Sequence, residues 1–180
     1  MDELLDICNE KGAVVSQDTK TNAHKLGLWH QSAHVWIYNS KGEVLIQLRA
    51  KNKSIYPDRW DVSAAGHVDA DEDVLDAAVR ETEEELNLDL NKDDLTFFKV
   101  KKIHYTYNDL INNEFYYIYF YKFDGNIKVL EIQEEEVQEI KFISIDDLEQ
   151  DLKDNPDKYV PQPDNYWEEV IEEAKKNLQH

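Results

Sequence analysis

The stretch GHVDADEDVLDAAVRETEEELNL, Gly66 to Leu88, gives the strongest indication of the fold of this 180-residue chain. At the α-helical angle of about 100° per residue, its apolar side chains form one narrow stripe. A helix over about residues 71–86 would turn that stripe toward a sheet. The members of the stripe are Leu75, Ala78, Val79, Thr82 and Leu86.

Three glutamates of the same helix, Glu81, Glu84 and Glu85, are expected on the side opposite the stripe, within about one quadrant of one another. In water they repel one another by about a few tenths of a kcal/mol per pair. A hard divalent cation such as Mg²⁺ would turn this repulsion into ligation, because it prefers carboxylate oxygens, water and phosphate as ligands. A solvated acidic face is the alternative that the helix alone leaves open.

The spacing of residues around the glutamates points to the metal site. Glu72 stands six residues after Gly66, and Arg80 stands eight residues after Glu72, directly before Glu81. This pattern resembles the box of the Nudix hydrolase family, G-x₅-E-x₇-R-E-U-x-E-E-x-G-U, where U is a bulky apolar residue. Only two positions depart from the box: Thr82 replaces an apolar residue and Asn87 replaces glycine. Asn tolerates the left-handed conformation that ends a helix, so the second change is mild.

The resemblance covers about residues 28–151 and implies a fold, a cofactor and residue roles. The fold is an α/β (α+β) architecture, the Nudix α/β/α sandwich with a mixed central sheet. Glu81, Glu84 and Glu85 would hold Mg²⁺, for which Mn²⁺ could substitute. Arg80 and Glu72 would form a salt bridge that orients these glutamates, and Gly66 would begin the box.

The flanking sequence agrees with such a sandwich. A hairpin is expected from residues 33–39 and 43–50, with Gly42 at positive φ in the turn. Residues 60–66 read as a short strand. Three further strands are expected at residues 95–107, 114–123 and 139–145, and two helices at residues 145–152 and 165–178. We expect a single domain over residues 1–180.

The upstream residues resemble the branch of the family that includes isopentenyl-diphosphate isomerase and its hydrolase relatives. In that isomerase, residues matching His24, His30, His67 and Glu114 hold a metal, whereas Asn112 replaces a further acidic ligand. Residues matching Arg49 and Lys53 hold the substrate diphosphate there. A second metal site at His24, His30, His67 and Glu114 is therefore a hypothesis beside the simpler interpretation of packed histidines.

The isomerase also needs a cysteine directly before the glycine of the box, and here that residue is Ala65. The one cysteine of the chain, Cys8, is far away in sequence. Since the box is nearly complete and the proton carrier is missing, hydrolysis is favoured over isomerisation.

A glutamate beyond the box assists as base or metal ligand in many hydrolases of this fold, and Glu136 is the candidate here. Within the box, Glu84 or Glu85 is the preferred base. His34 and His104 lie in expected strands and are interpreted as structural histidines. The aromatic run at residues 114–123 is interpreted as core and edge packing rather than a platform for nucleobases.

The composition limits the partners. The chain has 20 Lys+Arg against 39 Asp+Glu, a net charge of −19, which repels nucleic acid and anionic membranes. The N-terminal residues lack the apolar run of a signal peptide, and we expect a cytoplasmic protein. A homodimer remains open beside a monomer.

The sequence therefore predicts a Mg²⁺-dependent hydrolase of a small-molecule diphosphate linked to another moiety. Isopentenyl-diphosphate isomerase and a catalytically idle nucleotide sensor are the alternatives. The box does not identify the substrate, because specificity in this fold comes from loops outside it.

Overall fold

The expected hairpin forms the centre of the structure, a computed structural model that describes residues 2–179. Strand β3 (His30–Tyr38) runs into β4 (Glu43–Arg49), and the two pair antiparallel at Tyr38 and Val44. Gly42 in the connecting turn has φ 81°, a conformation that glycine adopts without strain. The hairpin prediction is confirmed.

Strand β3 is the hub of a mixed seven-stranded sheet. It pairs parallel with β8 (Leu110–Lys122) along nine residues and antiparallel with the short β6 (Ala64–His67). The main path through the sheet is β5-β4-β3-β8-β7, with β9 paired to β4. The remaining strands of this sheet are β5 (Trp60–Asp61), β7 (Thr96–Tyr107) and β9 (Val137–Ser144).

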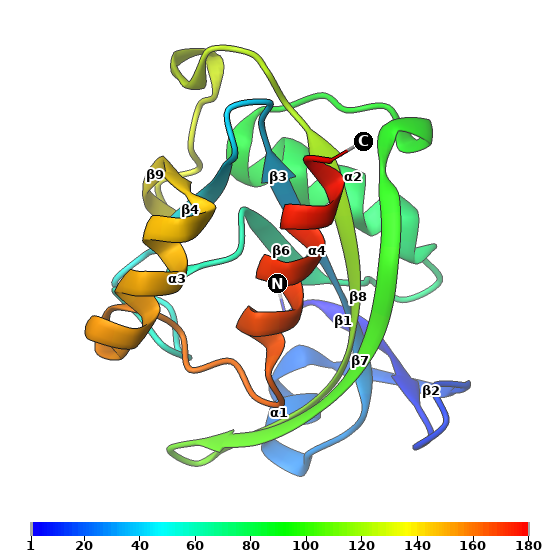
Figure 1. Ribbon diagram of the computed structural model, residues 1–180. Helices are drawn as coiled ribbons and strands as arrows, with labels where there is room; N and C mark the ends of the chain where they lie inside the picture. Colours follow the sequence, from blue (N-terminus) through cyan, green and yellow to red (C-terminus); the bar gives the residue numbers. More distant parts are fainter. Residues whose placement is uncertain (1, 180) are drawn as a thin grey trace.

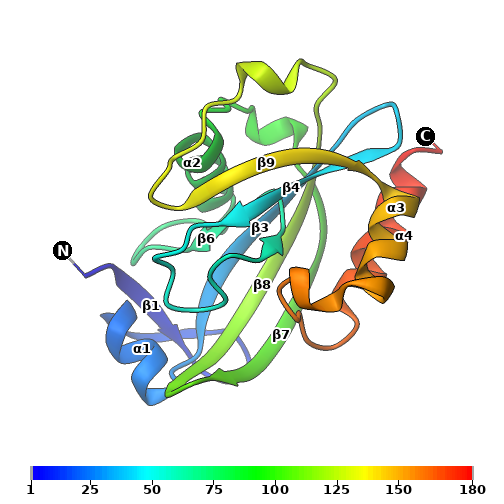
Figure 2. The same cartoon turned by 90° about the vertical axis from the view of Figure 1, so that its left-hand side faces the viewer.

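Helices cover both faces of this sheet, as Figures 1 and 2 show, so the expected α/β/α sandwich is confirmed. Helix α2 (Val74–Leu86) packs on the face formed by Ala33, Val35 and Ile37 of β3. Helices α3 (Ile145–Asp154) and α4 (Tyr166–Asn177) cover the other face, where Trp36 is fully buried. Single turns of 3₁₀ helix connect the elements: η1 (Lys92–Asp94), η2 (Ile127–Val129) and η3 (Pro156–Lys158).

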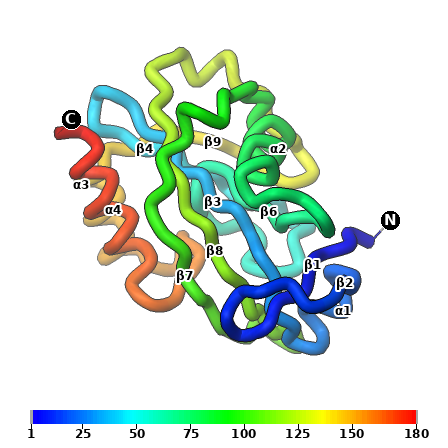
Figure 3. The backbone as a smooth tube through the Cα atoms, turned by 90° about the vertical axis from the view of Figure 1, so that its right-hand side faces the viewer, coloured from blue at the N-terminus to red at the C-terminus, as the bar shows by residue number. Residues whose placement is uncertain are grey.

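The N-terminal part of the chain contains elements that the sequence analysis did not predict. Strands β1 (Leu4–Cys8) and β2 (Val14–Thr19) form a two-stranded sheet, and α1 (Lys20–Leu26) follows directly. Figure 3 shows this unit beside the ends of β3 and β8. Leu5 and Ala23 are buried in a small separate cluster with Ile7. This unit brings Glu3, Lys20 and His24 to the edge of the main sheet.

The strand expected at residues 60–66 is interrupted and becomes β5 and β6. The cause is the side chain of Ser63, which is fully buried. Its hydroxyl donates to the carbonyl of Leu45 at 2.6 Å and accepts from the N–H of Ile37 at 2.8 Å. These side-chain bonds take the place of ladder bonds between β3 and β4 and allow the chain to cross from one strand to the other.

Helix α2 ends as the sequence analysis expected. Thr82 is fully buried on the sheet-facing stripe, and its hydroxyl donates to the carbonyl of Ala78. Asn87 caps the helix in the left-handed conformation with φ 49°, and its N–H donates to the carbonyl of Glu83.

Among residues 2–179 no helix combines the length and the apolar character needed to cross a membrane.

The cap at Asn87 can be tested by two substitutions that both remove its side-chain contact with Glu131. We expect Asn87→Gly to keep the free energy of unfolding within about 0.5 kcal/mol of the wild type. Asn87→Ala should lower the free energy of unfolding by about 1 kcal/mol, because the Cβ of alanine makes the left-handed conformation unfavourable. Urea unfolding followed by circular dichroism measures both values. An alanine variant as stable as the glycine variant would contradict the role of the left-handed cap.

Candidate active site

The glycine of the box provides space for a carboxylate. Gly66 lies in β6 with its α-carbon turned toward α2, and a Cβ placed there would come within 1.9 Å of the carboxyl carbon of Glu81. That distance is far below van der Waals contact, so any larger residue would displace Glu81. The close approach of strand and helix therefore depends on this glycine.

Arg80 is the centre of an ionic network on α2. Its guanidinium donates two hydrogen bonds to Glu72, each of 2.8 Å, one bond of 2.6 Å to Glu81 and one of 3.0 Å to the carbonyl of His67. The bonds to Glu72 raise the pKa of Arg80 above its ordinary value. Burial would raise the pKa of Glu72, but the bonds from Arg80 and from the N–H of Asp69 outweigh it and lower that pKa. Arg80 thus connects the helix to the loop before it.

Glu85 lies in a different environment from the one the helix pattern indicated. The sequence analysis expected it on the side opposite the sheet, but it is only 4% exposed. Its carboxylate accepts from the side-chain amide of Gln47 at 3.0 Å and from the N–H of Ala65 at 3.1 Å. Burial, and then the charge of Glu81, raise the pKa of Glu85 to about 8. Glu85 lies at the edge of the apolar stripe of the helix. Its side chain is long enough to extend to Gln47 and Ala65 on the strands, so it is buried despite its charge.

The other two glutamates are more accessible. Glu81 is intermediate in exposure, whereas Glu84 is exposed and accepts a long hydrogen bond of 3.5 Å from Arg80. Burial is the main cause that raises the pKa of Glu81, and Arg80 opposes it. Glu81, Glu84 and Glu85 all line one cavity of about 560 Å³. Carboxylates this crowded, two of them with raised pKa values, suit a hard divalent cation such as Mg²⁺.

The basic residues expected at the substrate phosphate line the same cavity, and both have protein partners. Arg49 donates to the carbonyls of Ile55 and Tyr56 and to the carboxylate of Asp61. It therefore holds the loop that follows β4. Lys53 in that loop forms an ion pair with Glu136, which comes from the segment before β9.

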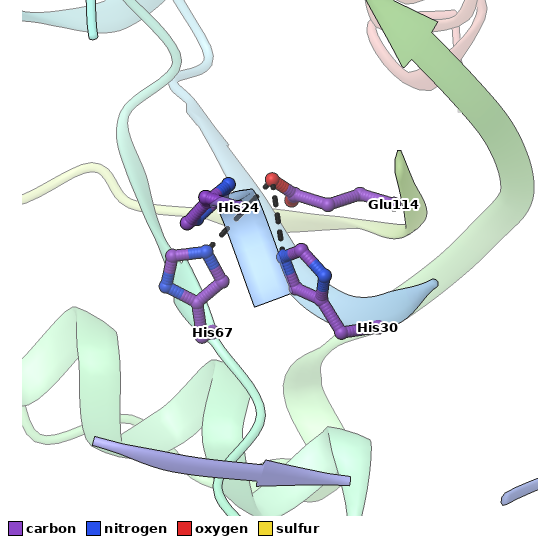
Figure 4. Close-up of side chains that lie close together, drawn as sticks. All are labelled: His24, His30, His67 and Glu114. Atoms are coloured by element: carbon purple, nitrogen blue, oxygen red, sulfur yellow. Dashed lines mark ion pairs between the residues drawn. The ribbon is translucent and has the colours of Figure 1, made fainter. Parts of the chain in front are cut away.

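The histidines of the proposed second site come together around one carboxylate, as Figure 4 shows. His24, His30, His67 and Glu114 offer ligand atoms that all lie within 4.8 Å of one another. The Glu114 oxygen Oε1 lies 3.6 Å from Nε2 of His30 and 3.8 Å from Nε2 of His67. The four residues come from α1, β3, β6 and β8, so this arrangement depends on the tertiary fold.

Unpaired buried atoms mark the same cluster. His30 uses Nδ1 to donate to the carbonyl of Leu28 at 2.9 Å, and its Nε2 has no hydrogen-bond partner among the residues that the structure describes. Within that same range, Nδ1 of His24 and the side-chain oxygen of Asn112 are also buried without partners. Asn112 and Glu114 are two residues apart on β8 and share one face. Unpaired lone pairs on two imidazoles beside a carboxylate fit a bound transition metal such as Zn²⁺ or Mn²⁺.

The electrostatics of the cluster agree with this fit. Burial, followed by the charge of His67, lowers the pKa of His24 to about 4, so its ring is neutral at pH 7. Burial would raise the pKa of Glu114, but the contacts with His30 and His67 hold it well below its ordinary value. Burial would lower the pKa of His67, but its contacts with Glu114 and Glu3 outweigh burial and raise that pKa. The neutral ring of His24 and the ionised carboxylate of Glu114 are in the protonation states that bind metals, whereas a metal at this site would compete with a proton on His67.

Sequence reasoning missed several residues of the cavity. Glu3, from the N-terminal strand region, lies 3.6 Å from Nδ1 of His67 and bonds to Lys20. Its pKa falls to about 2, chiefly through the contact with His67. Gln47, on β4, does not line the cavity itself but bonds to Glu85, and it was also missed. Nothing local in the sequence marks these residues, because their partners lie far away along the chain.

Two residues expected to be structural differ in their surroundings. His34 is buried and hydrogen-bonded to Tyr166, whereas His104 is exposed and bonded to Asn113. The aromatic run of β8 packs as expected, with Phe115 and Phe120 buried. Ala65 lies opposite His34 in the β3–β6 pairing and lines the cavity with a methyl group. No cysteine lines this cavity, since Cys8 is not among its lining residues.

Comparisons with known proteins agree with the geometry. The sequence model of the NUDIX domain matches residues 28–163. The chain is 31% identical over 150 residues to an uncharacterised Nudix hydrolase of Clostridium acetobutylicum, covering 82% of this chain and 72% of that protein. It is 30% identical over 160 residues to an isopentenyl-diphosphate Delta-isomerase of Serratia proteamaculans, covering 89% and 87%.

Solved structures show the same fold. The crystal structure of the protein DR0079 from Deinococcus radiodurans superposes with a TM-score of 0.68 at 20% identity, covering 97% of this chain and 98% of that one. The likeness extends over nearly the whole chain, including the N-terminal unit and the last two helices.

The contact between Gly66 and Glu81 can be tested by a double-mutant cycle. Gly66→Ala alone should lower the free energy of unfolding by about 2 kcal/mol, since its methyl group overlaps the Glu81 carboxylate. In a Glu81→Ala background the same change should cost less than about 1 kcal/mol. Denaturant unfolding of the four proteins gives both numbers. Equal costs in the two backgrounds would show that the glycine serves some purpose other than making room for Glu81.

Proposed function

Because the chain belongs to the Nudix hydrolase family, whose members act on diphosphate-containing small molecules, we propose that it is a Mg²⁺-dependent hydrolase of a diphosphate linked to another moiety. The observation that supports this most is the convergence of Glu81, Glu84 and Glu85 on one cavity, with Arg80 and Gly66 fixing Glu81. When bound, the cation supplies charge neutralisation for the phosphates and lowers the pKa of a coordinated water.

The residues of the chain divide the remaining tasks. Arg80 and Glu72 orient the helix carboxylates through their two-pronged hydrogen bonds. Lys53 binds a substrate phosphate oxygen, with Arg49 beside it at the base of the loop. When Lys53 binds the phosphate instead of Glu136, Glu136 loses its ion-pair partner and becomes free to accept a proton. Glu84 and Glu85 are the candidate bases within the box.

A second metal site at His24, His30, His67 and Glu114 is part of the proposal. The unpaired nitrogens of His24 and His30 support it, together with the neutral state of the His24 ring. His24, His67 and Glu114 line the cavity that also contains the box glutamates. One substrate could therefore contact both centres.

Isomerisation is the alternative that the relative from Serratia proteamaculans keeps open. Moving a proton across an allylic system requires acid and base groups on both sides of the carbon chain. Glu114 could serve one side, but Ala65 presents only a methyl group. A catalytically idle nucleotide sensor is the other alternative, and the complete set of three box glutamates argues against it.

The box assignment predicts strong effects from neutral replacements. Glu84→Gln or Glu85→Gln should lower kcat by about two orders of magnitude or more, because an amide is a poor ligand for Mg²⁺. The measurement is Mg²⁺-dependent release of phosphate or a monophosphate in a screen of nucleoside diphosphates, dinucleotides, sugar nucleotides and thiamin-type diphosphates. Glu83→Gln is the matched control, since this exposed neighbour on α2 faces away from the cavity and should keep wild-type rates. Wild-type turnover in both test variants would refute the metal assignment.

The histidine cluster predicts tight binding of a transition metal independent of catalysis. We expect one equivalent of Co²⁺ to bind and to give visible absorption bands. These bands should persist when Mg²⁺ is added, because Mg²⁺ does not displace the Co²⁺. His24→Gln should weaken Co²⁺ binding at least tenfold, because a lone pair of the site is lost. His104→Gln, which changes an exposed histidine outside the cluster, is the control. Co²⁺ binding that is the same in His24→Gln and the wild type would rule out this site.

The choice of hydrolysis over isomerisation predicts that isopentenyl diphosphate is not converted to dimethylallyl diphosphate. Position 65 cannot exchange a proton, whereas hydrolysis needs only an activated water and the box carboxylates. Proton NMR of isopentenyl diphosphate incubated with enzyme and Mg²⁺ tests this point. Appearance of the dimethylallyl isomer at enzymatic rates would overturn the hydrolase proposal.

A further inference from the structure

A buried chain of hydrogen bonds runs from the core to the wall of the active-site cavity. Trp36 Nε1 lies 2.9 Å from the hydroxyl of Tyr166, and that hydroxyl lies 2.7 Å from Nδ1 of His34. Trp36 and His34 alternate with Val35 on β3 and share one face, and α4 supplies Tyr166. Trp36 and Tyr166 are fully buried, whereas His34 also lines the cavity.

The direction of the protons in this chain is fixed. The indole of Trp36 can only donate, so the Tyr166 oxygen accepts from it. Tyr166 has a single hydroxyl proton and no other partner than Trp36 and His34 among residues 2–179. If His34 donated as well, that proton would be buried without an acceptor, which is costly. Tyr166 therefore donates to Nδ1 of His34, and the ring proton of His34 resides on Nε2.

The surroundings keep the imidazole neutral in this tautomer. Burial is the largest cause that lowers the pKa of His34 to about 4, opposed by the charges of Asp61 and Glu114 and aided by Arg49. At pH 7 the ring carries no charge. The Nε2–H of His34 is therefore a neutral donor, and the hydrogen bond from Tyr166 to Nδ1 on the opposite side of the ring fixes its direction.

This donor has no hydrogen-bond partner among residues 2–179, although His34 as a whole is only 5% exposed. Ser32, two residues earlier on the same face of β3, is 3% exposed, and its hydroxyl is buried without a partner. Both residues line the cavity. The Nε2–H of His34 and the hydroxyl of Ser32 therefore lack acceptors that a ligand in the cavity could supply.

We propose that His34 is a specificity residue that donates its Nε2–H to an uncharged acceptor on the organic moiety of the substrate, such as a hydroxyl or carbonyl oxygen, with Ser32 beside it. The proposal rests on the proposed diphosphate hydrolysis and adds the chemical class of the group linked to the diphosphate. Trp36 and Tyr166 are positioning residues, because they act on the substrate only through the tautomer of His34.

The charges of the cavity separate the two ends of such a substrate. Near His34 the charge of Asp61 is paired with that of Arg49, whereas Lys53 acts on Glu85 and Arg80 bonds to Glu81 at the end of the cavity that contains the box glutamates. A hydrocarbon at His34 would cover the Nε2–H of this residue without offering it an acceptor. The site should therefore prefer a polar, uncharged moiety over an isoprenoid chain by roughly tenfold or more.

The tautomer can be measured before any substrate is known. Long-range proton–nitrogen correlation spectra of the full chain labelled with ¹⁵N-histidine distinguish Nε2–H from Nδ1–H, and His34→Gln assigns the signal. We expect the Nε2–H tautomer at pH 7 in the wild type and a mixture of tautomers in Tyr166→Phe. An Nδ1–H tautomer in the wild type would overturn the proposal, whether or not the protein hydrolyses diphosphates.

The contact with the substrate is tested by a pair of variants. His34→Gln keeps an N–H near the position of Nε2, whereas His34→Leu removes it, and both lose the bond from Tyr166. With ADP-ribose as the polar probe, KM should rise at least tenfold more in His34→Leu than in His34→Gln, with a smaller change in kcat. With geranyl diphosphate as the hydrocarbon probe, the two variants should not differ. His104→Leu is the control for a histidine outside the cavity.

The outcomes separate this proposal from the one on which it rests. If neither probe nor any other diphosphate is hydrolysed by the wild type, the proposed function fails, and the shift of the His34 Nε2 signal on adding ADP-ribose with Ca²⁺ decides the binding role. If hydrolysis occurs but His34→Gln and His34→Leu have equal KM for ADP-ribose, the role of His34 in specificity is refuted.

Discussion

The candidate active site of this protein depends on one guanidinium that holds several carboxylates in place. Arg80 bonds to Glu72, to Glu81 and to the carbonyl of His67, and so joins α2, the loop before it and β6. Without that charge the glutamates of the box would repel one another within a half-buried space. Lysine could not replace it, because a single ammonium group cannot satisfy Glu72 through two parallel bonds and reach Glu81 as well. The glycine at position 66 completes the arrangement by leaving room for the carboxylate that Arg80 positions.

Strand β6 has four residues and serves both centres of the cavity. Because side chains alternate across a strand, Gly66 faces α2 while Ala65 and His67 face the opposite side of the sheet. His67 therefore joins the histidine cluster, and the backbone N–H of Ala65 bonds to Glu85. A shift of one residue in the pairing with β3 would place a side chain against Glu81 and move the imidazole away from Glu114. The register of this short strand thus determines the geometry of both clusters.

The sequence allowed the elements around the box to be predicted because their signals are local. The spacing from Gly66 to Glu85 and the turn at Gly42 depend on neighbours within one or two turns of chain. Three features could not be found in this way. The N-terminal unit of β1, β2 and α1 packs through a small cluster around Leu5, the burial of Glu85 requires Gln47 from a distant strand, and Ser63 interrupts a strand by bonding across two others. Each of these depends on contacts between residues far apart in sequence.

His34 illustrates the same limit for function. A histidine in an apolar strand is usually a packed core residue, and its bond to Tyr166 agrees with that interpretation. What distinguishes it is the unpaired nitrogen on the other side of the ring, at the wall of a cavity, which only the tertiary structure reveals. The tyrosine that sets its tautomer lies 132 residues away on the last helix. The last helix, on the face of the sheet opposite the glutamates of the box, therefore influences which hydrogen-bond donors the cavity presents. In this fold the box supplies the chemistry common to the family, and contacts from the opposite face of the sheet determine what the cavity can recognise.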